Sequence, residues 1–254
     1  MKVNKIEKTE FLDLVYNNTD GFLKTLEAPE AFVVKQFYPK EDILKIRNDV
    51  YESGKKTEPS WHACFDECPD FHRIHNNYPQ AYVKAIMHAY YHHGYYSSND
   101  KLFDCFSEIF DLKNYLAGEP QGSYIKNIPS RFFIARVNVH NYPKGGGYQA
   151  QHIDPISKFA KIQTIVQASE FGNDFKSGGV YAKLSEQGEK FYIDPHTEVG
   201  DLIVLSPSVL HGVGEIDAEI EEINWNENSG RWMIMPIIIH SDYESPDNVK
   251  PFEP

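Results

Sequence analysis

The spacing of hydrophobic and polar positions changes character near residue 128 of the chain. Before that point, apolar residues recur mainly at helical intervals, in segments that begin after Pro39 and span residues 80–91 and 101–116. This spacing predicts three helices, because residues three and four apart share one face of a helix. The dense apolar run at residues 31–38 instead predicts a strand.

After about residue 130, short apolar segments alternate with Gly, Pro and Asp residues, which favour turns. The polar stretch 217–230 does not fit a core strand, and we expect it to be an insertion loop. Eight regularly punctuated strands favour a sandwich or a double-sheet jelly roll. The expected strands are 131–140, 148–153, 161–168, 180–184, 191–194, 201–205, 209–213 and 231–239.

Composition limits the classes of function without naming one. The chain has 254 residues, 41% of them hydrophobic, which suits one domain of generous size. A formal net charge of −12 disfavours nucleic acid as a partner, because an acidic surface repels phosphate backbones. No N-terminal secretory signal and no apolar run long enough to span a bilayer are visible, so we expect a cytoplasmic protein.

The three cysteines are sparse and odd in number, which indicates a reducing compartment rather than a disulfide framework. His62, Cys64 and Cys68 lie close together in the sequence, as zinc ligands often do. They offer only three donors and no paired CxxC follows elsewhere, so we predict that they form no zinc site.

His152 and Asp154 carry the strongest chemical signal. On a strand, residues two apart point to the same face, so an imidazole nitrogen and a carboxylate oxygen converge there. A second imidazole, His211, begins a later predicted strand. Two histidines and one carboxylate on one face of a metal leave the opposite positions open, as non-haem Fe(II) oxygenases require. The sequence therefore predicts a metal site made by these three residues, which are also the candidate catalytic groups.

Arg231 stands at the start of the last apolar strand, directly after Gly230. A guanidinium group binds a carboxylate through two parallel hydrogen bonds. Buried at that place, it needs an anionic partner, because an unpaired buried charge is very costly.

The order His152-x-Asp154, His211, Arg231 resembles the signature of the 2-oxoglutarate/Fe(II)-dependent dioxygenases. Residues 141–154, with their Tyr-Pro and glycine-rich turn, and the segments 175–181, 192–194 and 200–212 are similar to the prolyl hydroxylase-like branch, and a phytanoyl dioxygenase-like branch is the neighbouring alternative. The resemblance implies Fe(II), 2-oxoglutarate and O₂ as reagents, succinate and CO₂ as products, and Arg231 as the anchor of 2-oxoglutarate. Because members that chlorinate their substrates lack the aspartate, Asp154 favours hydroxylation or a related oxidation.

One departure from the family pattern concerns spacing. Arg231 follows His211 by 231 − 211 = 20 residues, a longer interval than is usual in the family. The expected loop at 217–230 accounts for the excess. If it does not, Lys158, Lys161 or the face shared by Gln163 and Gln167 must hold the co-substrate.

Further pocket residues follow from strand parity. Tyr142 is placed like a pocket tyrosine of the prolyl hydroxylase-like branch, and Gln163 and Gln167 share a face on the strand after His152 and Asp154. These three are the weaker candidates for co-substrate binding. The candidates for substrate binding are Asn138, His140 and Tyr148.

The fold that the resemblance implies is mainly β with α: a double-stranded β-helix, which is a cupin-like jelly roll, with an N-terminal helical layer. We expect residues 1–127 to form the α-rich layer, 128–245 the catalytic core and 246–254 a tail. The expected substrate is a small molecule. A protein-directed hydroxylase or demethylase, and a cupin-like metal-binding or sugar-binding protein without oxygenase activity, remain alternatives. The sequence leaves the substrate and the oligomeric state open.

Overall fold

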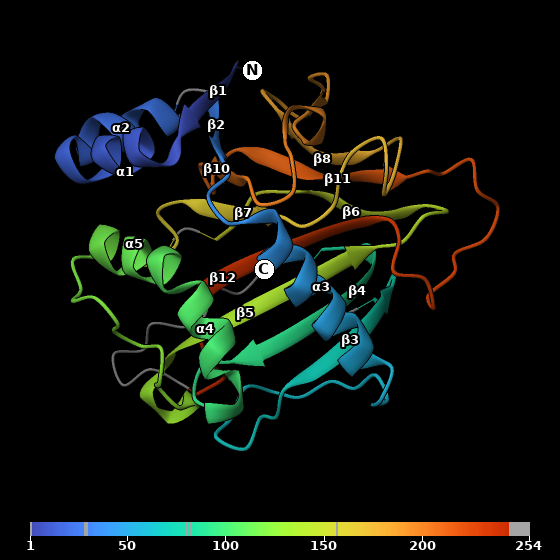
Figure 1. The fold of residues 1–254 in the computed structure, drawn as a ribbon, viewed down its shortest axis with the longest axis horizontal. Helices are drawn as coiled ribbons and strands as arrows, with labels where there is room; N and C mark the ends of the chain where they lie inside the picture. Colours follow the sequence, from blue (N-terminus) through green and yellow to red (C-terminus); the bar gives the residue numbers. More distant parts are fainter. Residues whose placement is uncertain (1, 28–29, 80, 82, 156, 244–254) are drawn as a thin grey trace.

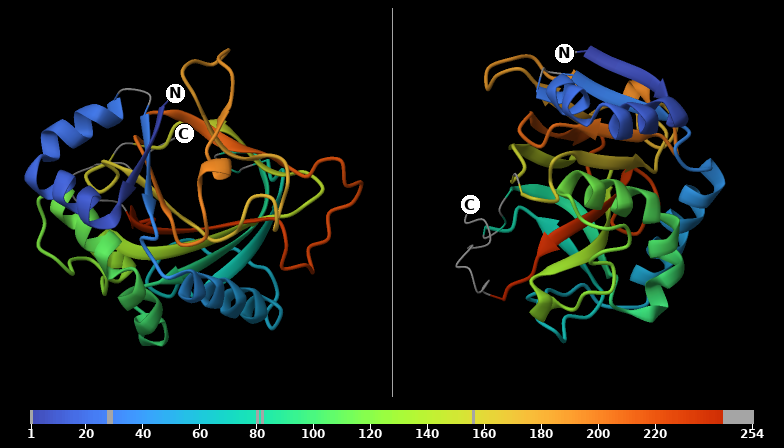
Figure 2. Two further views of the ribbon diagram at one scale, coloured as in Figure 1. Left: turned by 45° about the horizontal axis from the view of Figure 1, so that its top comes forward. Right: turned by 90° about the vertical axis from the view of Figure 1, so that its left-hand side faces the viewer.

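The computed structural model describes residues 2–27, 30–79, 81, 83–155 and 157–243, so the expected tail at 246–254 lies outside the described residues. Twelve strands form one continuous sheet that bends back on itself (Figure 1). Its two layers face each other across a shared interior, as the left view of Figure 2 shows. The double-stranded β-helix expected from the sequence is confirmed.

The larger layer holds eight strands. In hydrogen-bonded order they are β1 (Lys2–Glu7), β2 (Glu30–Lys35), β10 (Leu202–Leu205), β7 (Gln163–Gln167), β12 (Arg231–His240), β5 (Phe133–Tyr142) and β4 (Ala85–His93), with β3 (Phe71–Asn76) paired to β4. The smaller layer continues from β4 through a short pairing with β6. It consists of β6 (Gly147–His152), β11 (Leu210–Ile216), β8 (Gly179–Lys183) and β9 (Phe191–Tyr192).

The α-helices of the described residues lie on the outside of the strands (Figure 2). They are α1 (Lys8–Asn17), α2 (Thr19–Glu27), α3 (Lys40–Gly54), α4 (Asp100–Cys105) and α5 (Ser107–Ala117), accompanied by the short 3₁₀ turns η1 (Ser97–Asn99), η2 (Pro129–Arg131) and η3 (Asp194–His196).

Two hydrophobic cores form because side chains along a strand point alternately to its two faces. On β12, Trp232 and Ile234 belong to the core under the helices, while Met233 and Met235 belong to the core between the layers. Every second residue of β12, counted from Arg231, therefore faces the interior. This parity decides which side chains can form a site between the layers.

Most expected elements are confirmed. The helix after Pro39 is α3, the segment 101–116 is helical apart from a break at Phe106, and the strand expected at 31–38 is β2. All eight strands expected after residue 130 are present, with ends that differ by a few residues. The polar stretch 217–230 contains no helix or strand, as expected of a loop.

The helix expected at residues 80–91 is wrong. Ala85–His93 is instead strand β4, near the middle of the sheet, where it pairs with β3, β5 and β6. Most of its residues are buried, so the polar positions that reveal a half-exposed strand are few. A short buried strand and a buried helix cannot be distinguished by periodicity alone.

The segment before residue 128 contributes β1, β2, β3 and β4 to the sheet as well as helices, so it is more than a helical cover. The domain boundary at 128 stays a prediction. Within the described residues, no helix combines the length and the apolar character needed to cross a membrane.

Candidate active site

The expected metal ligands meet where β6 and β11 run side by side. His152 is the last residue of β6, and its Cα is paired in register with that of His211 on β11. The two imidazole rings lie with their centroids 4.4 Å apart. Asp154 lies two residues beyond the end of β6, where its backbone N–H donates to the Pro207 carbonyl at 2.9 Å. The convergence was expected from strand parity, but a backbone contact outside the strand produces it.

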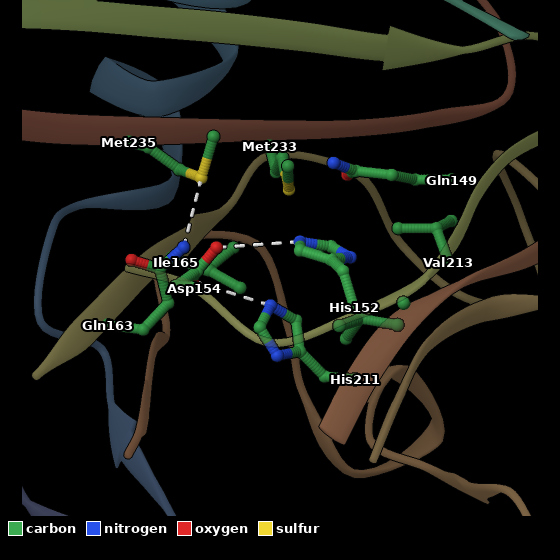
Figure 3. Close-up of a pocket in the computed structure, with 11 residues that line it drawn as sticks. Gln149, His152, Asp154, Gln163, Ile165, His211, Val213, Met233 and Met235 are labelled. Atoms are coloured by element: carbon green, nitrogen blue, oxygen red, sulfur yellow. Dashed lines mark hydrogen bonds and ion pairs between the residues drawn. The ribbon is translucent and has the colours of Figure 1, made fainter. Parts of the chain in front are cut away.

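The ligand atoms face one another in a group (Figure 3). Nε2 of His152 lies 3.4 Å from Oδ1 of Asp154, and Nε2 of His211 lies 3.4 Å from Oδ2. The Nδ1 atoms point away, toward the carbonyl oxygens of Ala150 at 2.9 Å and Val209 at 2.7 Å. A carbonyl only accepts, so each Nδ1 carries the proton and each neutral imidazole presents the Nε2 lone pair toward the carboxylate. These three donors can hold a divalent cation.

Electrostatics keep Asp154 ready as a ligand. Burial raises the pKa of Asp154, but hydrogen bonds from His152 and His211 outweigh it and hold the pKa below its usual value. Burial lowers the pKa of His211, but the hydrogen bond and the charge of Asp154 raise it more. The net pKa of His211 is therefore above its usual value. The carboxylate is thus ionised at neutral pH, as metal binding requires.

A cavity of about 70 Å³ opens onto these three residues. Besides the ligands, Gln149 of β6 and Gln163 of β7 supply amide groups to its wall, and Ile165, Met233 and Met235 supply apolar surface (Figure 3). Met233 and Met235 follow Arg231 on the inward face of β12. The metal-binding atoms therefore lie in an enclosure that combines apolar side chains with two amides.

Arg231 is fully buried, as expected, and its partner is Asp194. The Nε atom of Arg231 donates to Oδ2 of Asp194 at 2.8 Å, and Nη2 approaches Oε1 of Gln167 at 3.4 Å. The sequence analysis missed Asp194, which begins η3. The only available sign was a lone carboxylate after the apolar residues 191–193, and that pattern is common in turns.

Two donors beside this ion pair have no hydrogen-bond acceptor among the described residues: Nη1 of Arg231 and Nε2 of Gln167. Both are buried, and a buried donor without an acceptor destabilises the fold by about 1–3 kcal/mol. Tyr142 packs against the same group, with its ring 5.8 Å from the guanidinium carbon and its hydroxyl donating to Gln149 Oε1 at 2.7 Å. An anion with two acceptor oxygens matches these orphaned donors.

The insertion loop explains how Arg231 reaches this place despite the long interval. Arg47 of α3 donates from Nε to Asn228 Oδ1 at 2.9 Å and from Nη1 to Asp174 Oδ2 at 3.0 Å. Gly230 follows with φ of 86°, and a Cβ there would lie 2.3 Å from the carbonyl oxygen of Tyr142. The loop is thereby fastened outside the sheet, and β12 pairs with β5 from its first residue, Arg231.

The two lysines considered as alternative anchors lie elsewhere. Lys158 is exposed and forms an ion pair with Glu119, and Lys161 is exposed. Gln163 remains in the cavity wall, and Gln167 lies beside Arg231. Among the anchors weighed from the sequence, Arg231 and the two glutamines are the ones that face the interior.

The three candidate substrate residues lie in two different environments. Asn138 and His140 are buried on the inward face of β5, where Asn138 Oδ1 accepts from Arg136 Nε at 2.7 Å. Burial lowers the pKa of His140 to about 3, so this ring is neutral at physiological pH. Tyr148 donates to Asn77 Oδ1 at 2.5 Å and lines neither the metal-facing cavity nor the larger one described below.

A second group missed from the sequence is Lys113 of α5. It is almost fully buried, and its Nζ donates to the Ile162 carbonyl at 3.2 Å. Burial lowers the pKa of Lys113 to about 8, and the charge of Asp154 opposes that shift. A single lysine on an amphipathic helix is normally predicted to face solvent. Hydrophobic periodicity therefore could not reveal that Lys113 is buried.

A larger cavity of about 480 Å³ adjoins the metal-facing one, and Gln149 lines both. Aromatic rings of Phe71 and Tyr91 and the guanidinium groups of Arg73 and Arg136 contribute to its wall. The two arginines lie over the rings of Tyr78 and Tyr91, and neither forms an ion pair within the described part of the chain.

Comparison with known proteins shows the fold. No family model and no curated protein sequence matches the chain. Among solved structures, a full-length Neurospora crassa protein in complex with alpha-KG matches at 14% identity and a TM-score of 0.56, over 96% of this chain and 86% of that one. The same protein with alpha-KG and 5-formyluracil matches at 15% identity and a TM-score of 0.54, over 98% and 91%.

A putative 2OG-Fe(II) oxygenase family protein from Caulobacter crescentus matches at 9% identity and a TM-score of 0.50, over 92% of this chain and 86% of that one. Likenesses at such low identity establish a shared fold, here that of the 2-oxoglutarate/Fe(II) oxygenases. They leave the chemistry to be argued from the residues of the site.

Proposed function

We propose that the chain is a non-haem Fe(II)/2-oxoglutarate-dependent oxygenase that oxidises a small molecule. The convergence of His152, Asp154 and His211 carries the proposal, because two imidazole nitrogens and one carboxylate in this fold leave the opposite side of a metal open. The shared fold supports it, since the Neurospora crassa protein binds alpha-KG within the same architecture.

The residues around Arg231 fit the co-substrate. 2-Oxoglutarate is a dicarboxylate, and its distal carboxylate matches the orphaned Nη1 of Arg231 and Nε2 of Gln167. Asp194 fixes the guanidinium group through Nε and leaves the other edge available to the ligand. Tyr142 packs beside Arg231 and donates a hydrogen bond to Gln149, which lines the metal-facing cavity. Arg231 and Gln167 would thus bind one end of the molecule, and the ligand triad would bind the metal that takes the other end.

Iron with its co-substrate supplies the oxidation of a substrate C–H bond by O₂, with succinate and CO₂ released. The protein contributes binding, orientation and the exclusion of water. The carbonyl acceptors of Ala150 and Val209 hold both imidazoles in one tautomer. Ile165, Met233 and Met235 keep the cavity apolar, which protects a reactive centre from side reactions with water.

The larger cavity suits a small-molecule substrate. Its volume of about 480 Å³ falls within the range of ordinary small-molecule pockets, roughly 300–1,000 Å³. Arg73 and Arg136 line this cavity and form no ion pair within the described residues, and their two positive charges outnumber the one carboxylate of the wall, Asp242. An aromatic or apolar molecule that carries an anionic group fits this wall, and Gln149 lines both this cavity and the metal-facing one.

The deciding experiment measures succinate formation by the purified chain with Fe(II), 2-oxoglutarate and O₂, over a library of small acidic metabolites and a matched neutral library. We expect turnover above the background rate with members of the acidic library, and loss of turnover in Asp154→Ala. Turnover only with peptides would replace the small molecule by a protein substrate. Iron binding without any 2-oxoglutarate turnover would favour the cupin-like binding protein.

A further inference from the structure

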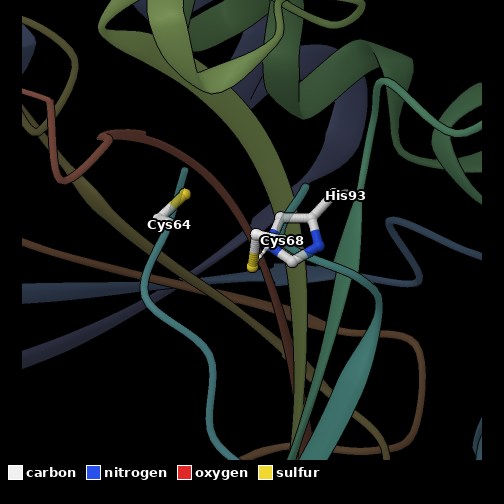
Figure 4. Close-up of side chains that lie close together, drawn as sticks. All are labelled: Cys64, Cys68 and His93. Carbon is white, nitrogen blue, oxygen red and sulfur yellow. Dashed lines mark hydrogen bonds between the residues drawn. The ribbon is translucent and has the colours of Figure 1, made fainter. Parts of the chain in front are cut away.

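A second group of potential metal ligands lies outside the proposed oxygenase site. Cys64 and Cys68 come from the segment between α3 and β3, and His93 is the last residue of β4 (Figure 4). Their two sulfur atoms and one imidazole nitrogen all lie within 4.8 Å of one another, and all three side chains are buried. The sequence analysis considered His62 as the histidine of this group and rejected a site for want of ligands. His62 is exposed and packs against Phe71, whereas His93 joins the two cysteines.

The His93 ring is oriented as a ligand would be. Its Nδ1 lies 3.2 Å from Oδ1 of Asp70, and its Nε2 lies 3.9 Å from the Cys68 sulfur. An ionised carboxylate only accepts, so Nδ1 carries the proton and Nε2 presents its lone pair to the sulfur atoms. A carboxylate behind an imidazole in this way fixes the tautomer and raises the basicity of many metal-bound histidines.

Asp70 is itself firmly held. It also accepts from the backbone N–H of His93 at 2.8 Å and from Asn99 Nδ2 at 2.6 Å. Tyr95 and Tyr96 both donate to the carbonyl of Cys68, at 2.8 and 3.0 Å. Hydrogen bonds with neighbouring residues therefore hold both the His93 ring and the backbone at Cys68 in place.

The spacing of the donor atoms suits zinc. Tetrahedral zinc with bonds of about 2.3 Å to sulfur and about 2.0 Å to nitrogen separates its ligand atoms by roughly 3.5–3.8 Å. The observed separation of 3.9 Å between Cys68 and His93, and the limit of 4.8 Å for the group, need only a small contraction. The interval Cys64-x₃-Cys68 is also within the usual range for zinc ligands on one turn.

We propose that Cys64, Cys68 and His93 form a zinc site, separate from the His152, Asp154 and His211 site. Two thiolates neutralise the charge of Zn²⁺, which makes the burial of this group favourable.

Cys64 lines the larger cavity together with Asp242, so a zinc ion bound to Cys64 would border that cavity. The site would fasten the segment around Cys64 and Cys68, which lacks regular strands or helices, to the central strand β4. That segment forms part of the wall next to Arg136. The zinc is thus a structural support for one side of the cavity, independent of the oxidation chemistry proposed above.

The test measures metal content by mass spectrometry in chains produced under reducing conditions with zinc in the medium. The wild-type chain and Asp154→Ala should both retain a stoichiometric zinc, since Asp154 belongs to the other site. Cys64→Ser and Cys68→Ser should lose it, while Cys105→Ser, which changes a free cysteine outside the group, should retain it.

Cobalt provides a readout that does not require substitution of the proposed zinc ligands. Co²⁺ added to the zinc-free, reduced Asp154→Ala chain should give thiolate-to-cobalt charge-transfer absorption, which histidine and carboxylate ligands cannot produce. Alkylation of the thiols before the addition should abolish it. A chain that takes up no zinc and shows no such absorption, zinc that persists in Cys64→Ser and Cys68→Ser alike, or a Cys64–Cys68 disulfide isolated from reduced cells would each overturn the proposal.

Discussion

Arg231 and Asp194 form an ion pair in which both side chains are fully buried, with Nε of the arginine 2.8 Å from Oδ2 of the aspartate. Each partner therefore depends on the other, because one of them alone would be an unpaired charge in the interior. The pair uses only part of the guanidinium group, and Nη1 keeps an unfilled hydrogen bond within the described residues. In the proposed function, stability and co-substrate binding are therefore coupled at this one side chain.

The first prediction separates these two roles. Arg231→Met should weaken 2-oxoglutarate binding ~10²-fold, because a charge-assisted carboxylate pair in a dry site is lost. It should also lower the free energy of unfolding by ~3–5 kcal/mol, because Asp194 stays buried without its partner. Titration calorimetry and denaturant unfolding measure the two effects, and iron content should not change.

The double variant Arg231→Met/Asp194→Asn is the matched control. Removing both charges should restore most of the stability, since replacing a buried ion pair by neutral groups is often harmless. The affinity for 2-oxoglutarate should remain low. Unchanged affinity in both variants would place the anchor elsewhere, with Lys113 as the next buried cation to examine.

The second prediction concerns the metal. Asp154→Ala should abolish Fe(II) binding and turnover but keep the fold, because Asp154 lies outside the strands and does not belong to either hydrophobic core. Iron analysis and circular dichroism check the two halves of this statement. Asp49→Ala, which removes an exposed carboxylate on α3, should leave iron and turnover intact. Full activity in Asp154→Ala would contradict the assignment of the ligands.

The third prediction uses pH. The pKa of Lys113 is lowered in the fold from 10.5 to about 8, so the fold favours the neutral amine. Ionised Lys113 therefore destabilises the fold as the pH falls below 10.5, and the penalty levels off below about 8. In the metal-free chain, Lys113→Met should raise the free energy of unfolding by ~1–3 kcal/mol at pH 7, and the gain should shrink as the pH rises toward 10.

Unfolding curves at pH 7 and pH 9.5 test this sign directly. Lys101→Met, at an exposed lysine of α4, serves as a control with no expected pH-dependent gain. A loss of stability in Lys113→Met at both pH values would mean that the hydrogen bond to Ile162 matters more than the buried charge.

The fourth prediction addresses the larger cavity. Arg136→Met should raise KM for acidic substrates ~10-fold or more, while 2-oxoglutarate affinity stays the same, because Arg136 faces the larger cavity rather than the Arg231 group. The exposed Arg131→Met offers a matched control. Equal effects of Arg136→Met on acidic and neutral substrates would remove the argument for an anionic group.

The sequence predicted which candidate ligands meet better than it predicted the residues around them. His152, Asp154 and His211 were identifiable from their residue types and their order along the chain, although Asp154 lies beyond the end of β6 and is held by a backbone contact to Pro207 rather than by strand parity. Asp194 and Lys113 were not, because each acts through a contact with a residue far away in the chain. A single sequence carries no signal for such pairings.

The error at β4 has a related cause. The sheet surrounds this strand with β3, β5 and β6, so its burial comes from partners distant in sequence. Local periodicity reports one exposed and one buried face, and a strand with little exposed surface violates that assumption. The same error concealed His93, the last residue of β4, and with it the third donor beside Cys64 and Cys68.

Both ends of the loop between β11 and β12 are hydrogen-bonded to the same short backbone segment, residues 174–177. Asp217 accepts from the N–H groups of Lys176 and Ser177 through Oδ1, and the N–H of Gly230 donates to the Asp174 carbonyl. With both ends fixed within a few residues, the number of residues between them hardly affects where β12 starts, and loop-closure entropy changes slowly with length. Evolution can therefore lengthen or shorten this loop without moving Arg231, so distant relatives are better aligned by strand pairing than by counting residues between motifs.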